Sequence, residues 1–167
     1  HNLQNIGGAL HICNSVGIKP KDFYKAITSF SGASNRLELI YKSSNSTIFK
    51  DFAHSPSKVK ATSEAVRKQF PQIRLIAFFE LHTYSSLNPA FLNKYGDTLN
   101  SADECYIYYS EKNMKIKRLT PIDSKLIIHS FNHQNLTVID NYENLEETIF
   151  SLDLTNSVLL MMSSGKF

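Results

Sequence analysis

An acid and a histidine stand three residues apart in the stretch "DFAHSP", residues 51–56. The carboxylate of Asp51 offers two acceptor oxygens, which suit the paired hydroxyls of a ribose. The imidazole of His54 can donate to phosphate oxygens, helped by the free N–H groups and the dipole of a helix that begins nearby. Residue types alone favour a simpler alternative, in which Asp51 caps a turn and His54 is an ordinary loop histidine.

Two further polar segments follow apolar runs that are typical of buried strands. The segment "ELHTYSSLNP" comes after "IRLIAFF", and "SSGKF" comes after "SVLLMM". In open α/β sheets, ligands bind at the carboxyl ends of the strands. We therefore expect a binding site where these two loops meet the loop that contains Asp51.

The elements that must position these loops alternate between helix and strand patterns. Two helices are predicted first, within residues 3–13 and 19–30, and then a hairpin of residues 37–41 and 47–52. Further helices are predicted over 56–70, 88–99, 120–131 and 142–152, and further strands over 73–81, 105–109, 136–140 and 157–162. This order predicts a Rossmann-like α/β fold, in which an N-terminal hairpin joins a mostly parallel, doubly wound sheet, preceded by a short helical segment.

Composition and charge argue against several classes of partner. The 167 residues carry a net charge of +3, which is too low to suggest a nucleic-acid-binding face. The basic run at 111–118 is expected to be a solvated loop. No apolar stretch reaches the ~18 residues of a membrane span. Cys13 and Cys105 form no CxxC pattern, so neither a metal site nor a disulfide framework is predicted, and unpaired thiols fit the cytoplasm.

Five features of the sequence, in the same order, resemble the Mur ligase family: "HNLQN", Arg36, "DFAHSPSKVKAT", "LIAFFELHTYSS" and "LLMMSSG". Mur ligases are ATP-dependent enzymes that add amino acids or peptides to UDP-N-acetylmuramic acid when peptidoglycan is built or recycled. The resemblance implies that residues 1–35 are the helical end of a central ATP-binding domain. It implies that residues 36–167 are the C-terminal domain that recognises the amino-acid or tripeptide acceptor.

The resemblance also assigns roles to individual residues. Those matched to contacts with ATP are His1, Asn2, Asn5, Arg36, Asp51 and His54. His54 matches a histidine beside the terminal phosphate and is the expected catalytic residue. Those matched to the acceptor site are His82, Thr83, Tyr84, Ser85, Ser86 and Ser164. ATP and Mg²⁺ are expected to be held mainly by the central domain, because the sequence contains no G-x-x-x-x-G-K-[ST] phosphate loop, and the 167 residues alone are expected to be inactive.

Two branches of the family are alternatives for the acceptor. Ligases that add L-alanine usually carry "P-H-x-Y-x-R", whereas this sequence has Leu81 at the proline position and Ser86 at the arginine position. Phe52, Glu80 and the ending "MSSGKF" resemble murein peptide ligases, which attach a recovered tripeptide. In both branches the resemblance implies that the muramyl carboxylate is activated as an acyl phosphate, which an amine then attacks.

Alternatives outside these branches rest on fewer features. Ligases that extend folate with glutamate share a "D-x-A-H-x-P" element, but the segments "HTYSS" and "HNLQN" favour the muramyl branch. A non-catalytic, Rossmann-like binding module would use the same sheet. A dinucleotide dehydrogenase is disfavoured because no G-x-G-x-x-G follows a predicted strand.

Overall fold

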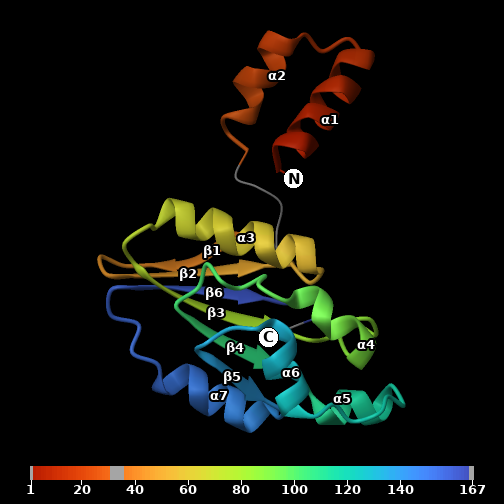
Figure 1. Ribbon diagram of the computed structural model, residues 1–167. Coiled ribbons are helices and arrows are strands. Elements are labelled where there is room, and N and C mark those ends of the chain that lie inside the picture. The colour runs from red at the N-terminus through yellow and green to blue at the C-terminus, as the bar shows by residue number, and fades with distance from the viewer. Residues whose placement is uncertain (1, 31–35, 166–167) are drawn as a thin grey trace. The chain divides into compact units, whose positions relative to one another are not determined.

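The computed structural model describes residues 2–30 and 36–165, and the chain divides into two compact units, residues 1–33 and 34–167 (Figure 1). The first unit contains α1 (Asn2–Ser15) and α2 (Pro20–Ile27). Gly17 follows α1 with φ +90°, a conformation that suits glycine after a helix. Pro20 begins α2, where its missing N–H costs no helical hydrogen bond. Both helices agree with the sequence prediction.

The second unit is a six-stranded sheet with helices on both faces. Its strands are β1 (Glu38–Lys42), β2 (Ser46–Asp51), β3 (Arg74–Glu80), β4 (Glu104–Tyr108), β5 (Leu136–Ile139) and β6 (Ser157–Met162). Its helices are α3 (Pro56–Gln69), α4 (Pro89–Leu92), the 3-10 turn η1 (Asn93–Tyr95), α5 (Glu111–Ile116), α6 (Ser124–Phe131) and α7 (Tyr142–Ser151).

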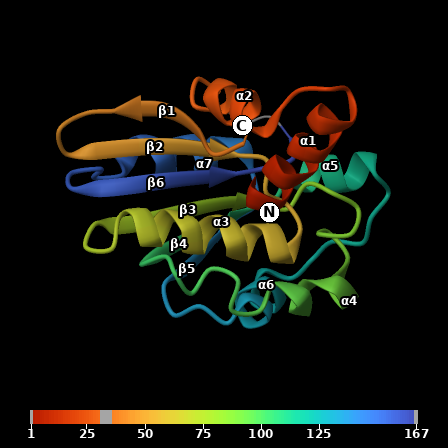
Figure 2. The same cartoon turned by 90° about the horizontal axis from the view of Figure 1, so that it is seen from above.

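The strand order is β1-β2-β6-β3-β4-β5, with β1 at one edge (Figure 2). β1 pairs with β2 in the antiparallel direction, and the other four neighbouring pairs are parallel. The predicted fold class, a mostly parallel Rossmann-like sheet with an N-terminal hairpin, is therefore confirmed.

The core lies on both sides of β3, whose side chains alternate between two layers. Leu75, Ala77 and Phe79 pack in a cluster with residues of α3, α4 and α6. Ile76 and Phe78 pack in a second cluster with α7. A strand that is covered on both faces needs apolar residues at consecutive positions, which explains the continuous run in the sequence.

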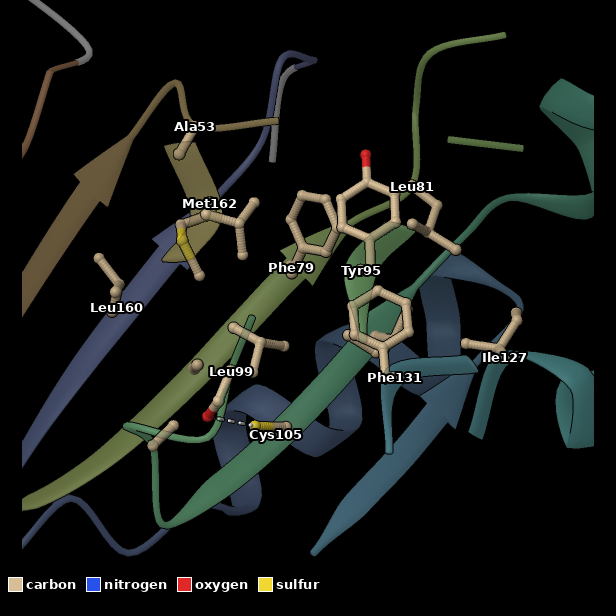
Figure 3. Close-up of a cluster of buried hydrophobic side chains, with 14 of the residues drawn as sticks. Ala53, Phe79, Leu81, Tyr95, Leu99, Cys105, Ile127, Phe131, Leu160 and Met162 are labelled. Carbon is tan, nitrogen blue, oxygen red and sulfur yellow. Dashed lines mark hydrogen bonds between the residues drawn. The ribbon is translucent and has the colours of Figure 1, made fainter. Parts of the chain in front are cut away.

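The side chain of Tyr95 connects this core to the loop after β2. Its ring lies beside those of Phe79 and Phe131, with its centroid 5.2 Å from each (Figure 3). Its hydroxyl donates a hydrogen bond of 2.6 Å to the main-chain carbonyl of His54. Burial raises the pKa of Tyr95 to about 12, so the hydroxyl keeps its proton and stays a donor at neutral pH.

Two predicted segments differ from the structure. The helix predicted over 88–99 is shorter, because α4 and η1 end before Gly96, and Asp97 then adopts the left-handed conformation with φ +60°. The solvated loop predicted at 111–118 begins instead with α5, whose Met114 side chain is buried.

Candidate functional site

The carboxyl ends of β2, β3 and β6 lie at one edge of the sheet, because these neighbouring strands are parallel. Ser163, which follows β6, is bonded to the other two strands. Its main-chain N–H donates to the carbonyl oxygen of Asp51 at 3.0 Å, and its hydroxyl donates to the carboxylate of Glu80. The three polar loops of the sequence are thus joined at one place.

The carboxylate of Asp51 organises the corner where β2 ends. Its Oδ2 accepts the N–H of Leu37 at 2.6 Å, and its Oδ1 accepts the N–H of Ala53 at 2.7 Å. The hydroxyl of Thr62 lies 3.4 Å from the same Oδ1. Leu37 has φ +45°, a strained conformation for a residue other than glycine, so the hydrogen bond stabilises an unfavourable turn. Asp51 therefore has a structural function, and its contact with ribose stays a prediction.

His54 is held within the same loop. Its Nδ1 lies 2.8 Å from the carbonyl oxygen of Phe52, and its ring meets the Phe52 ring edge-on with centroids 5.1 Å apart. Because a carbonyl only accepts, Nδ1 must carry the hydrogen in this contact, and Nε2 is left for another partner. The imidazole is partly exposed. Its contact with a phosphate and its catalytic role remain predictions.

The other residues matched to ATP contacts are divided between the two units of the chain. Arg36 is exposed and directly precedes Leu37, whose N–H binds Asp51. His1 lies outside the described residues, as does the side chain of Asn2. Asn5 is exposed on α1, within the unit of residues 1–33. Their contact with the same nucleotide as Asp51 stays a prediction.

The loop after β3 is stabilised by its own hydroxyl groups. The side chain of Thr83 accepts the N–H of Ser86 at 3.1 Å and contacts the hydroxyls of Ser85 and Ser86 at 3.1 and 3.0 Å. Ser86 is only 1% exposed, so it shapes the loop and does not face solvent. Tyr84 is exposed, and the hydroxyl oxygen of Ser164 is buried without a hydrogen-bond partner among the described residues.

Lys117 contacts this loop from the segment after α5. Its ammonium group donates to the carbonyl oxygen of His82 at 2.5 Å and lies 5.0 Å from the centroid of the Tyr84 ring, a cation–π distance. It places a positive charge beside the loop in which Ser86 stands at an arginine position. This contact was not predicted from the sequence, because the basic run at 111–118 was expected to be a solvated loop.

A polar cavity of about 420 Å³ opens beside the ends of β3 and β4. The residues that line it are Glu80, His82, Tyr108, Asn113, Tyr142, Leu145 and Gly165. Glu80 is 4% exposed, and its Oε1 lies 3.1 Å from Nδ1 of His82. Of these residues only His82 was predicted as part of a site. The signal for Glu80 was an acid at the end of a buried apolar strand.

Within residues 2–30 and 36–165, no group of three or more His, Cys, Asp and Glu side chains could hold a metal ion. In the same part of the chain, no helix is long and apolar enough to cross a membrane.

The sheet and its loops define an α/β domain whose polar groups gather where parallel strands end. The family described as "Mur ligase, glutamate ligase domain" matches residues 35–165 of this chain. This match covers more than half of the chain, and the chain belongs to the Mur ligase family.

Several relatives and solved structures resemble nearly the whole chain. A UDP-N-acetylmuramate–L-alanine ligase of Prochlorococcus marinus is 30% identical over 99% of this chain and 37% of its own length. One from Ruthia magnifica is 28% identical over 99% of this chain and 36% of its own. The chain therefore spans about a third of the length of these relatives.

Among solved structures, a murein peptide ligase of Psychrobacter arcticus has a TM-score of 0.69 at 21% identity, over 99% of this chain and 34% of its own. The UDP-N-acetylmuramate–alanine ligase of Thermotoga maritima has a TM-score of 0.74 at 18% identity, over 99% of this chain and 35% of its own. At these identities the likeness shows the shared fold.

Proposed function

We propose that this chain supplies the acceptor-binding domain of an ATP-dependent ligase that joins a short peptide to UDP-N-acetylmuramate. The observation that carries this proposal is the joining of three loops, through Ser163, beside a polar cavity of about 420 Å³. A cavity of this size is larger than alanine needs and suits part of a peptide. Ser86 is buried in its loop and carries no charge, so it cannot replace the arginine that alanine-adding ligases usually have at this position.

The chemistry is the activation of a carboxylate followed by aminolysis. The muramyl carboxylate takes the terminal phosphate of ATP, which gives an acyl phosphate and ADP. The acceptor amine attacks the acyl carbon, a C–N bond forms, the bond to the phosphate oxygen breaks, and phosphate leaves. Positioning and charge stabilisation supply most of the catalysis in such a sequence.

Residues of this chain would contact the nucleotide at the corner where β2 ends. The oxygens of Asp51 already accept two N–H groups, but a carboxylate has about four acceptor positions, so contact with ribose hydroxyls is compatible with the geometry. Nε2 of His54 would contact the terminal phosphate. Mg²⁺ would neutralise charge on the phosphates, and we assign it, with most of the ATP contacts, to the central domain of a cytoplasmic, full-length enzyme.

L-Alanine is the second candidate acceptor. The curated relatives of Prochlorococcus marinus and Ruthia magnifica are both UDP-N-acetylmuramate–L-alanine ligases. A domain assigned to a UDP-N-acetylmuramate:L-alanyl-γ-D-glutamyl-meso-diaminopimelate ligase of Haemophilus ducreyi, 25% identical with a TM-score of 0.54 over 78% of this chain and 89% of its own, supports the peptide instead.

The test measures phosphate release by the full-length gene product with ATP, Mg²⁺ and UDP-N-acetylmuramate. Separate reactions contain the tripeptide L-alanyl-γ-D-glutamyl-meso-diaminopimelate, L-alanine or no acceptor. We expect release that depends on the tripeptide. Release with alanine alone would assign the second candidate, and no acceptor-dependent release would contradict the ligase proposal. The 167 residues alone are expected to release no phosphate from ATP.

A further inference from the structure

We propose, on the basis of the ligase function above, that His82 is the base that accepts the proton of the incoming amine. Glu80 is then a positioning residue, which holds the His82 imidazole in the tautomer that can act as a base. Neither role follows from the acceptor-binding function that the family resemblance gives to His82.

The contacts of Glu80 determine which nitrogen of His82 carries hydrogen. One carboxylate oxygen accepts the hydroxyl of Ser163, and the other lies 3.1 Å from Nδ1 of His82. An ionised carboxylate can only accept hydrogen bonds, so Nδ1 must donate. In the neutral imidazole Nε2 then has a free lone pair.

The burial of the two side chains separates their functions. The side chain of Glu80 is 5% exposed and that of His82 is 35% exposed, so the imidazole is the more accessible of the two to a ligand. Both residues line the cavity of about 420 Å³, together with Tyr108, Asn113 and Tyr142. A peptide amine in this cavity would reach the imidazole more readily than the largely buried carboxylate.

Gly165 keeps the pair in place by a close approach of the main chain. A Cβ atom at this position would lie 2.8 Å from Oε2 of Glu80 and 2.9 Å from Nδ1 of His82, closer than real Cβ atoms come to other atoms. The N–H of Gly165 also donates to the Ser163 hydroxyl at 2.7 Å. The carboxylate of Glu80, the imidazole of His82 and the turn after β6 thus pack tightly against one another.

This geometry supplies a step that the ligase reaction requires. An amine is mostly protonated at neutral pH and cannot attack until it loses a proton. Nε2 of His82 would accept this proton, and the buried carboxylate of Glu80 would stabilise the imidazolium that forms. The free amine attacks the acyl phosphate, its second departing proton leaves with the phosphate, and His82 later returns its proton to water.

The test uses the full-length ligase and the changes His82→Gln and Glu80→Gln. We expect kcat to fall about 100-fold or more in both variants, while KM for the acceptor changes by less than about threefold. Exposed residues of the same types provide matched controls, and His129→Gln and Glu147→Gln should leave both constants unchanged. In His82→Ala, added imidazole should restore part of kcat.

Nitrogen-15 NMR of the imidazoles provides a second measurement that a merely structural role would not change. His82 should carry its hydrogen on Nδ1 in the unmodified protein and shift toward the Nε2 tautomer in Glu80→Gln. If His82→Gln raises KM for the acceptor and leaves kcat unchanged, His82 binds the acceptor carboxylate and the inference is wrong while the ligase function stands. An unmodified protein with no acceptor-dependent turnover would contradict the proposed function itself.

Discussion

The change Asp51→Asn separates the structural function of this carboxylate from its predicted contact with ribose. The two carboxylate oxygens accept main-chain N–H groups of Leu37 and Ala53 at 2.6 and 2.7 Å. An asparagine offers one oxygen and one NH₂ group, so one of these N–H groups would face another donor. Losing a hydrogen bond to a charged acceptor costs about 1.5–3 kcal/mol. Because Asp51 is partly exposed and water can solvate the abandoned N–H, we expect a loss of about 2 kcal/mol.

Urea unfolding of the 167-residue chain measures this loss. The midpoint of Asp51→Asn should fall while the slope of the transition stays the same, since the surface exposed on unfolding does not change. Glu147→Gln, at an exposed position on α7, is the control and should not move the midpoint. If Asp51→Asn unfolds at the same urea concentration as the unmodified chain, the turn does not depend on this carboxylate. A raised KM for ATP in the full-length variant would then assign Asp51 to the nucleotide alone.

Three further outcomes follow from the geometry and the pKa shifts. Gly165→Ala places a methyl group 2.8 Å from the Glu80 carboxylate, so it should lower stability by about 1–3 kcal/mol in urea unfolding and reduce kcat of the full-length ligase. Burial raises the pKa of Cys105 to about 12, so a thiol reagent at pH 8 should label Cys13 rapidly and Cys105 only after unfolding. Burial alone would raise the pKa of Asp103, but the main-chain N–H of Leu75 and the guanidinium of Arg67 outweigh it, and the pKa is lowered. The ionised Asp103 therefore stabilises the fold at neutral pH. That contribution should disappear as pH falls through its folded-state pKa, and unfolding of Asp103→Asn from pH 7 to 3 should lack it.

Much of the fold could be predicted from the sequence because local patterns and tertiary packing agree. The run Arg74–Glu80 is apolar at nearly every position, and in the sheet it is buried on both faces. Elements whose ends depend on backbone conformation were harder to predict. The helix after Asn88 ends early because Asp97 adopts a positive φ, and an aspartate in that conformation leaves no pattern in the sequence.

Residues of the candidate site could be predicted only where they stand at the end of a strand or in the loop that follows it. Asp51, His54 and His82 have this position in the sequence, and the structure places them at the same edge of the sheet. Glu80 and Lys117 contribute through contacts across 83 and 35 residues of sequence, with Ser163 and His82 respectively. Such pairings depend on strand order and on the path of the chain after α5, which spacing along the sequence does not define.

Ser163 connects the corner around Asp51 to the cavity beside Glu80. Its main-chain N–H binds the carbonyl oxygen of Asp51 and its hydroxyl binds the carboxylate of Glu80, so one residue adjoins both the predicted nucleotide corner and the acceptor cavity. β6 lies between β2 and β3, so both bonds come from the end of a central strand. A ligase must hold the activated carboxylate and the amine in a fixed relation for the amine to attack. In the proposed ligase, the position of β6 at the centre of the sheet would provide that relation through two hydrogen bonds from Ser163.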